Sequence, residues 1–193
     1  RIDGPLRAHY LNQGISSINL TAGKTPGAPV LAARSNLPGS ASAGNTAASA
    51  IAIDASALGA MTAGRITVIS TDAGMGVNLR GPVLAYQQDI DIQSAGRVST
   101  GDLAASRDIR INADGFVVTG GSVAANDKLQ VSGKEGILLA GPASAGQGIE
   151  LASSQGNVSA QGPLATAGDL QVTAAQRVTL ESQSAASTIA GNT

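Results

Sequence analysis

The chain has 193 residues with one Phe, two Tyr and no Trp, so its apolar content consists mostly of Ala, Val, Ile and Leu. Because compact globular cores are usually filled by aromatic rings, this composition favours a thin core of small and branched side chains. With a net charge of −1, 13% charged residues and no Cys, the chain carries no basic patch for nucleic acid, no disulfide framework and no thiolate metal site.

The first third of the chain contains two strand-like segments separated by an irregular stretch. Ile18-Asn19-Leu20 and Ile51-Ala52-Ile53 alternate as strands do. Between them, residues from about 21 to 50 are dominated by Ala, Gly, Ser, Pro and Asn, which predicts an irregular loop outside the regular fold. The chain shows no basic-then-apolar leader and no long apolar run, so we expect neither an export signal nor a membrane span, but a piece of a longer precursor.

From about residue 63 onward the sequence repeats with a nearly constant period of about 20 residues. Doublets that begin with Gly follow one another at almost equal intervals, at Gly81, Gly101, Gly121, Gly141 and Gly162. Pairs of apolar residues recur in step with these doublets: Ile66/Val68, Ile90/Ile92, Ile109/Ile111, Leu129/Val131, Ile149/Leu151 and Leu170/Val172. A period of this length made of strands and turns predicts an all-β solenoid whose repeat unit is one coil.

Strand alternation assigns directions to these residues. Both members of each pair face the interior, and we expect these twelve residues to form the structural core. The residue between them faces outward and is polar in every coil: Thr67, Asp91, Arg110, Gln130, Glu150 and Gln171. A second inward position follows after a short gap in each of the later coils: Val98, Val117, Ile137, Val158 and Val178. Each coil therefore has at least two β faces joined by turns.

The sequence contains no complete motif for catalysis, for a cofactor or for a metal. Gly23-Lys24-Thr25 lacks the earlier Gly of a phosphate-binding loop, because position 18 is Ile. Gly74-Met75-Gly76 lacks the third Gly of a dinucleotide fingerprint. His9 is the only His, which disfavours a His-based triad or a multi-His metal site. We expect no catalytic, cofactor-binding or metal-binding residues, and no cofactor.

Acidic residues need separate consideration, because many β-helix proteins are enzymes that act on polysaccharides. Asp89 and Asp91 share an outward face, and Asp108 and Arg110 occupy the same two columns in the next coil. Stacking therefore predicts that Asp91 lies beside Arg110. Neighbours on one flat face do not oppose each other across a sugar, so a solvated charge ladder is favoured over a catalytic cleft.

One segment is more than periodic. Residues 53–81 read IDASALGAMTAGRITVISTDAGMGVNLRG, in which an Ala-Leu-Gly-x-Met-x-Ala-Gly stretch leads into a strand and then a Gly-x-Gly-Val turn. This segment closely resembles the end of the secretion domain of filamentous-haemagglutinin-like exoproteins, the passengers of bacterial two-partner secretion. Residues 1–6 and 18–23 are similar to earlier coils of that domain, and residues 85–182 resemble the degenerate repeats that follow it. The Asn-Pro-Asn motifs found earlier in that domain have no counterpart, because no Asn-Pro pair occurs.

The resemblance implies a right-handed, single-stranded parallel β-helix (solenoid) with coils of about 20 residues, which is the period of the sequence. It divides the chain into residues 1–83, the C-terminal part of a two-partner secretion-type domain with an irregular loop at about 21–50, and residues 84–193, β-helical haemagglutinin-type repeats. The full-length protein would pass through an outer-membrane two-partner secretion transporter and reach the bacterial cell surface or the medium.

We expect a non-enzymatic structural and adhesive shaft segment of a virulence-related exoprotein that presents distal binding or toxin domains. One alternative is the stalk of a contact-dependent growth inhibition toxin, and another is a polysaccharide-acting β-helix enzyme. The sequence does not name the receptor on a host or neighbouring cell, and it predicts no nucleic-acid partner. Open parallel edges of the coils would allow end-to-end self-association.

Overall fold

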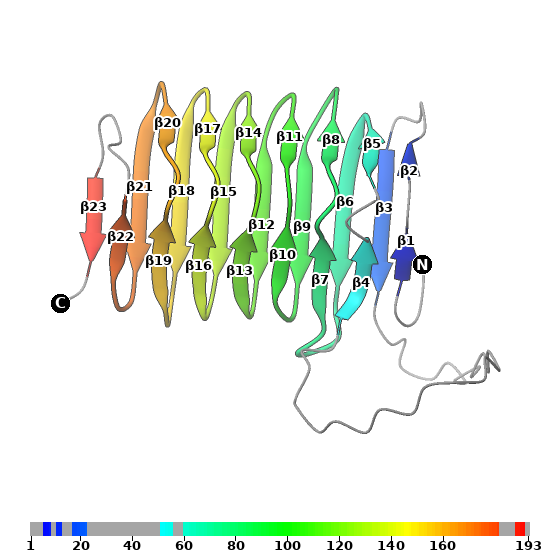
Figure 1. The fold of residues 1–193 in the computed structure, drawn as a ribbon, viewed down its shortest axis with the longest axis horizontal. Coiled ribbons are helices and arrows are strands. Elements are labelled where there is room, and N and C mark those ends of the chain that lie inside the picture. The colour runs from blue at the N-terminus through cyan, green and yellow to red at the C-terminus, as the bar shows by residue number, and fades with distance from the viewer. Residues whose placement is uncertain are drawn as a thin grey trace.

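The computed structural model describes residues 6–8, 11–12, 17–22, 51–55, 60–181 and 188–191. Within these ranges all regular secondary structure is β-strand, and the strands stack side by side into an elongated solenoid (Figure 1). This arrangement confirms the predicted all-β solenoid with parallel strands. The same ranges contain no helix with the length and apolar character needed to cross a bilayer.

Consecutive strands belong to three different sheets, here named A, B and C. Sheet B contains β1 (Leu6–Ala8), β4 (Ile51–Ala55), β7 (Gly76–Leu79), β10 (Val98–Thr100), β13 (Phe116–Thr119), β16 (Gly136–Leu139), β19 (Asn157–Ala160) and β22 (Val178–Leu180). Sheet C contains β2 (Leu11–Asn12), β5 (Met61–Ala63), β8 (Val83–Ala85), β11 (Leu103–Ala105), β14 (Val123–Ala125), β17 (Ala143–Ala145) and β20 (Leu164–Thr166). Sheet A contains β3 (Ser17–Ala22), β6 (Arg65–Ser70), β9 (Ile90–Ser94), β12 (Ile109–Ala113), β15 (Lys128–Gly133), β18 (Gly148–Ser153), β21 (Asp169–Ala174) and β23 (Thr188–Gly191).

One complete coil consists of a strand from sheet B, one from sheet C and one from sheet A. In sheet A, β12 pairs in parallel with β9 and with β15, so Ile109 is in register with Ile90 and Leu129. The sequence period is therefore one turn of the solenoid. Sheet C is a third face beyond the two that the apolar pattern revealed, because strands such as β11 and β14 are too short to display a clear alternation.

The core is a set of apolar columns that run along the solenoid axis. The twelve paired residues of sheet A are all buried: Ile66, Val68, Ile90, Ile92, Ile109, Ile111, Leu129, Val131, Ile149, Leu151, Leu170 and Val172. Sheet B adds a parallel column in which Val98, Val117, Ile137 and Val158 are buried, whereas Val178 is only half-buried in β22, the last described strand of that sheet. Each buried aliphatic side chain contributes about 1.5–3 kcal/mol relative to an exposed one, so like-on-like stacking sets the register of the coils.

The Gly doublets mark the corner between sheets B and C, where consecutive coils approach closely. A Cβ atom added at Gly101 would lie 2.2 Å from the backbone oxygen of Arg80, and one at Gly141 would lie 2.3 Å from that of Gly121. Neither glycine has a positive φ, because the described glycines with positive φ are Gly74 and Gly136. The requirement at these corners is therefore space between two backbones.

The early part of the chain joins the same ladder. In β3, Ile18 and Leu20 are in register with Ile66 and Val68 of β6, so this segment is a strand as predicted. The irregular loop predicted at about 21–50 includes Thr21 and Ala22, which the structure places in β3. Its remaining part, residues 23–50, lies outside the described residues.

Candidate functional site

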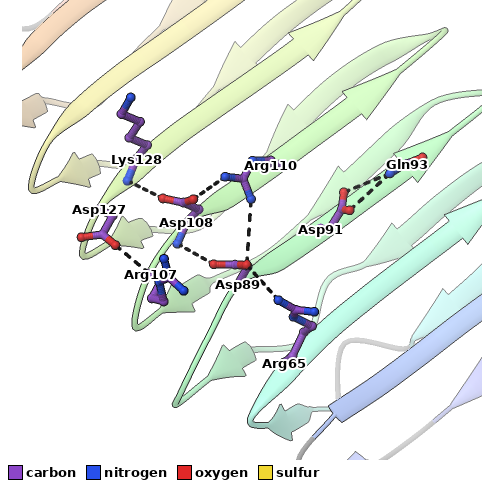
Figure 2. A network of polar contacts seen from close by, with 9 residues as sticks. All are labelled: Arg65, Asp89, Asp91, Gln93, Arg107, Asp108, Arg110, Asp127 and Lys128. Carbon is purple, nitrogen blue, oxygen red and sulfur yellow. Dashed lines mark hydrogen bonds and ion pairs between the residues drawn. The ribbon is translucent and has the colours of Figure 1, made fainter.

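A network of charged side chains follows the corner between sheets C and A (Figure 2). Asp89 lies directly before the first inward residue of β9, and Asp108 holds the same position before β12. Arg65 Nη2 lies 3.4 Å from Asp89 Oδ2, and Arg110 Nη1 lies 4.0 Å from the same oxygen. Arg110 Nη2 also donates a hydrogen bond to Asp108 Oδ2. The network therefore links three consecutive coils.

The carboxylates of this network also bind the backbone of the following coil. Asp89 Oδ1 accepts a hydrogen bond of 3.3 Å from the Asp108 backbone nitrogen, and Asp108 Oδ1 accepts one of 3.1 Å from that of Lys128. Both Asp side chains are mostly buried, with 16% and 15% of their surface exposed. These bonds satisfy backbone donors at the starts of β12 and β15, and they give the two carboxylates a structural role.

The structure corrects the predicted partner of Arg110. Its backbone is in register with Asp91, as the stacking of coils predicted. Its guanidinium, however, contacts Asp108 on its own coil and Asp89 on the preceding coil. The Asp91 carboxylate instead accepts hydrogen bonds from Gln93 Nε2 at 3.4 and 3.2 Å. A long side chain can reach diagonally across a sheet, and two carboxylates in one column attract the guanidinium more strongly than one directly opposite.

Sequence reasoning missed several members of such ladders. Asp102 Oδ1 accepts hydrogen bonds from the backbone nitrogen and hydroxyl of Ser122, at 2.8 and 2.9 Å. Arg107 Nε lies 3.7 Å from Asp127 Oδ2 in the next coil. The two partners in each pair lie one sequence period apart, so the period itself is the signal that could have found them.

On the outer face of sheet B, the ring of Phe116 packs over a glycine of the next coil. Phe116 is in register with Gly136, where a Cβ atom would lie 2.3 Å from the ring. The ring therefore occupies the space above a glycine whose φ is +150°. The guanidinium carbon of Arg97, from the preceding coil, lies 6.0 Å from the ring centroid, and such a contact contributes about 0.5–1 kcal/mol at an exposed site.

Three shallow hollows follow one another over the outer face of sheet A, with volumes of about 270, 280 and 180 Å³. Asn112 lines both the first and the second hollow, whereas Gln130 and Glu150 line both the second and the third. Neighbouring hollows therefore share rim residues along the outer face of sheet A. Within the described residues, no group of three or more His, Cys, Asp or Glu side chains is arranged to hold a metal ion.

Comparison with known proteins gives three relatives over part of the chain. The chain is similar to CdiA proteins. It is 36% identical over 89 residues to a tRNA nuclease CdiA of Escherichia coli strain NC101, which covers 46% of this chain. It is 37% identical over 100 residues to a 16S rRNA endonuclease CdiA of Enterobacter cloacae, covering 52%, and 34% identical over 146 residues to a tRNA nuclease CdiA of Yersinia mollaretii, covering 57%.

These matches involve a small part of each relative. The matched regions span 3%, 3% and 5% of the three CdiA proteins. No family model matches the chain, and no solved structure matches it. The similarity is nevertheless compatible with the predicted resemblance, because a parallel solenoid with one strand per sheet in each coil suits the repeat region of a filamentous-haemagglutinin-like protein.

Proposed function

We propose that this chain is a non-enzymatic shaft segment of a large, surface-exposed bacterial exoprotein of the two-partner secretion type. The observation that carries the proposal is the continuous parallel ladder of sheets A, B and C through the described coils. Each inner coil hydrogen-bonds to both neighbours, so the stack resists bending. An eight-stranded sheet of this kind has a length of about 34 Å, from seven steps of about 4.8 Å.

The similarity to CdiA proteins favours the stalk of a contact-dependent inhibition protein over a dedicated adhesin. Its relatives carry names of nucleases, yet the matched regions are only 3 to 5% of their lengths. In this proposal the nuclease belongs to another region, and the segment holds distal domains away from the cell. Residues 1–83 would complete a secretion-type domain, and residues 84–193 would begin the repeats.

The solenoid architecture also suits passage through an outer-membrane transporter, which we propose as the partner of the full-length protein. Each coil contacts mainly the coils beside it, so folding can proceed one coil at a time as the chain emerges. A fold built on distant pairings would instead require long-range contacts before any part became stable.

Deletion of one coil from the full-length exoprotein tests the proposal. Removing residues 101–120 joins Thr100 to Gly121 and leaves every later column in register, because Gly121 is equivalent to Gly101. We expect surface display of the distal domain, measured by antibody binding to intact cells, to be retained. Removing residues 121–130 disrupts the columns and should abolish display. Loss of the distal activity after the whole-coil deletion, with display intact, would contradict a passive shaft.

A further inference from the structure

A hollow of about 210 Å³ lies on the outer face of sheet B, over strands β4, β7 and β10, which are neighbours in that sheet (Figure 1). Its lining contains two arginines, Arg80 and Arg97, and no Asp or Glu. Among the other lining residues, Ile51 is 39% exposed, and Asn78 and Ser99 are outward-facing polar residues of β7 and β10. The lining therefore carries positive charge only, which selects for an anion.

The two arginines of the hollow have no carboxylate partner. Within the described ranges, the arginines near the corner between sheets C and A are all paired with carboxylates: Arg65, Arg107 and Arg110. In the same ranges Arg80 and Arg97 make no ion pair and donate no side-chain hydrogen bond. Asp54 of β4 is in register with Asn78 but does not line the hollow, and its Oδ1 accepts a hydrogen bond of 2.8 Å from Asn78 Nδ2. A guanidinium carries five N–H donors, so the hollow holds two sets of charged donors that an anion would satisfy.

The two guanidinium groups approach the hollow from opposite ends of the strands. Arg97 lies directly before β10 and beside Gly76 of β7, whereas Arg80 lies directly after β7 and beside Gly101. Glycine has no side chain, so each arginine has space over the adjoining strand. The two positions are separated by about four residues along the strands, which is about 13 Å. Because both arginines line one hollow, a ligand there would meet a guanidinium at each end.

The ring of Phe116 positions one of these two groups. The guanidinium carbon of Arg97 lies over the ring, 6.0 Å from its centroid. A guanidinium that stacks on a ring uses its planar face, and its N–H donors point outward from the edge of that plane. Arg97 is therefore held in place before a ligand binds, and its donors stay available.

A phosphate monoester matches this arrangement better than other common anions do. A carboxylate presents two oxygens along one edge, which suits a single guanidinium, whereas a tetrahedral phosphate presents terminal oxygens toward two guanidiniums at once. Near neutral pH a phosphate monoester carries a charge of about −1.5 to −2, which balances two arginines. A sulfate ester has the same shape but only a single charge.

We propose that the hollow on sheet B binds a phosphate monoester group between Arg80 and Arg97. The Ser99 hydroxyl, which makes no hydrogen bond within the described ranges, is a further donor to the phosphate oxygens. The proposed shaft function assigns no ligand to this face. The two proposals are independent, because a shaft without this site remains a shaft.

Nuclear magnetic resonance of the ¹⁵N-labelled 193-residue chain tests the proposal, with phenyl phosphate as the probe and phenyl sulfate as its matched control. We expect phenyl phosphate to shift the amide signals of Gly76, Arg97 and Ser99 in a saturable way, and to bind at least about threefold more tightly than phenyl sulfate near neutral pH. The second ionisation of a phosphate monoester has a pKa of about 6, so this advantage should disappear at about pH 5. Equal affinity for the two probes near neutral pH, or saturable shifts confined to other faces, would overturn the proposal.

Three charge-removing variants locate the site. Arg80→Gln and Arg97→Gln should each weaken phenyl phosphate binding at least about tenfold, because each removes charged donors to the phosphate. Arg177→Gln is the matched control, since Arg177 is an exposed arginine of sheet B outside the lining. It precedes β22, four strand spacings or about 19 Å from β10, and its loss should change binding less than about twofold. All three side chains are exposed, so the fold should be kept. An equal loss in the three variants would show a general charge effect and overturn the site.

Cosedimentation with lipid vesicles distinguishes the two sources of such a group. Phosphatidylcholine vesicles would contain either phosphatidic acid, a phosphate monoester, or phosphatidylglycerol, a phosphate diester. Cosedimentation with phosphatidic acid alone, lost in Arg80→Gln, would identify a lipid headgroup, whereas phenyl phosphate binding without cosedimentation would identify a soluble ester. Equal cosedimentation with both vesicle types, unchanged in Arg80→Gln, would show attraction to any anionic surface and would contradict a monoester site.

Discussion

The strand register of sheet A makes a strong prediction for two adjacent residues of β12. Ile111 is 2% exposed and is in register with Ile92 and Val131 inside the core. The Ile111→Asp variant loses the burial of an aliphatic side chain, about 1.5–3 kcal/mol. It also places an unpartnered carboxyl group among apolar columns, which adds a further penalty of about 1–3 kcal/mol or more. We therefore expect a loss in unfolding free energy of about 4 kcal/mol or more.

The adjacent Arg110 provides the matched control. Its side chain is 45% exposed, so solvent screens its ion pairs, and the Asp89 and Asp108 carboxylates keep their backbone hydrogen bonds when it is removed. Exposed pairs contribute about 0–1 kcal/mol because solvent screens them, so Arg110→Ala should cost less than about 1 kcal/mol. Arg110→Ala removes more side-chain atoms than Ile111→Asp does, yet we expect it to cause the smaller loss of unfolding free energy.

Urea denaturation followed by circular dichroism measures both variants. With a slope of about 2 kcal/mol per M of urea, the Ile111→Asp midpoint should fall by about 2 M and the Arg110→Ala midpoint by less than about 0.5 M. Equal midpoints, or a larger loss for Arg110→Ala, would refute the inward and outward assignment of β12. The columns on which the shaft proposal rests would then be wrong.

Three further predictions concern the corners and one buried hydroxyl group. Gly141→Ala should lower stability by about 1–3 kcal/mol because its Cβ meets the Gly121 backbone, whereas Gly120→Ala, whose Cβ has 3.6 Å of space, should be neutral or stabilising in the same thermal melts. Thr119→Val should raise stability by about 1 kcal/mol, because Thr119 Oγ1 is buried without a hydrogen-bond partner; a lower melting temperature would contradict this. Asp102→Ala should cost about 1 kcal/mol in the native chain and almost nothing in a Ser122→Pro background, since proline lacks the N–H that donates to Asp102; an equal cost in both backgrounds would disprove that bond.

The repeat pattern predicts the fold well because it records a local rule in every coil. Alternation along a strand places Ile109 and Ile111 on one face and Arg110 on the other, and burial in the structure follows that assignment. The pattern predicts sheet C less well. Strands such as β14, with the sequence Val-Ala-Ala, are short and rich in Ala, so they carry almost no periodic signal.

The polar surface could be predicted only in part. The repeat spacing gives the columns, and it correctly places the backbone of Arg110 beside that of Asp91. It does not give the direction of a flexible side chain, which in the structure contacts Asp89 and Asp108. Nor does it reveal the three hollows over sheet A, because each is lined by residues of several coils.

The sequence by itself determined the length of the coil, the parallel all-β architecture and the inward columns of sheet A. These features depend on spacing along the chain, since a residue and its equivalent one period later must stack whatever the other side chains do. The tertiary structure alone decided the third sheet, the partners of Arg110 and the lining of the hollows over sheet A. Those features depend on distances between side chains of different coils, which become defined only when the backbone has closed each turn and set neighbouring strands about 4.8 Å apart.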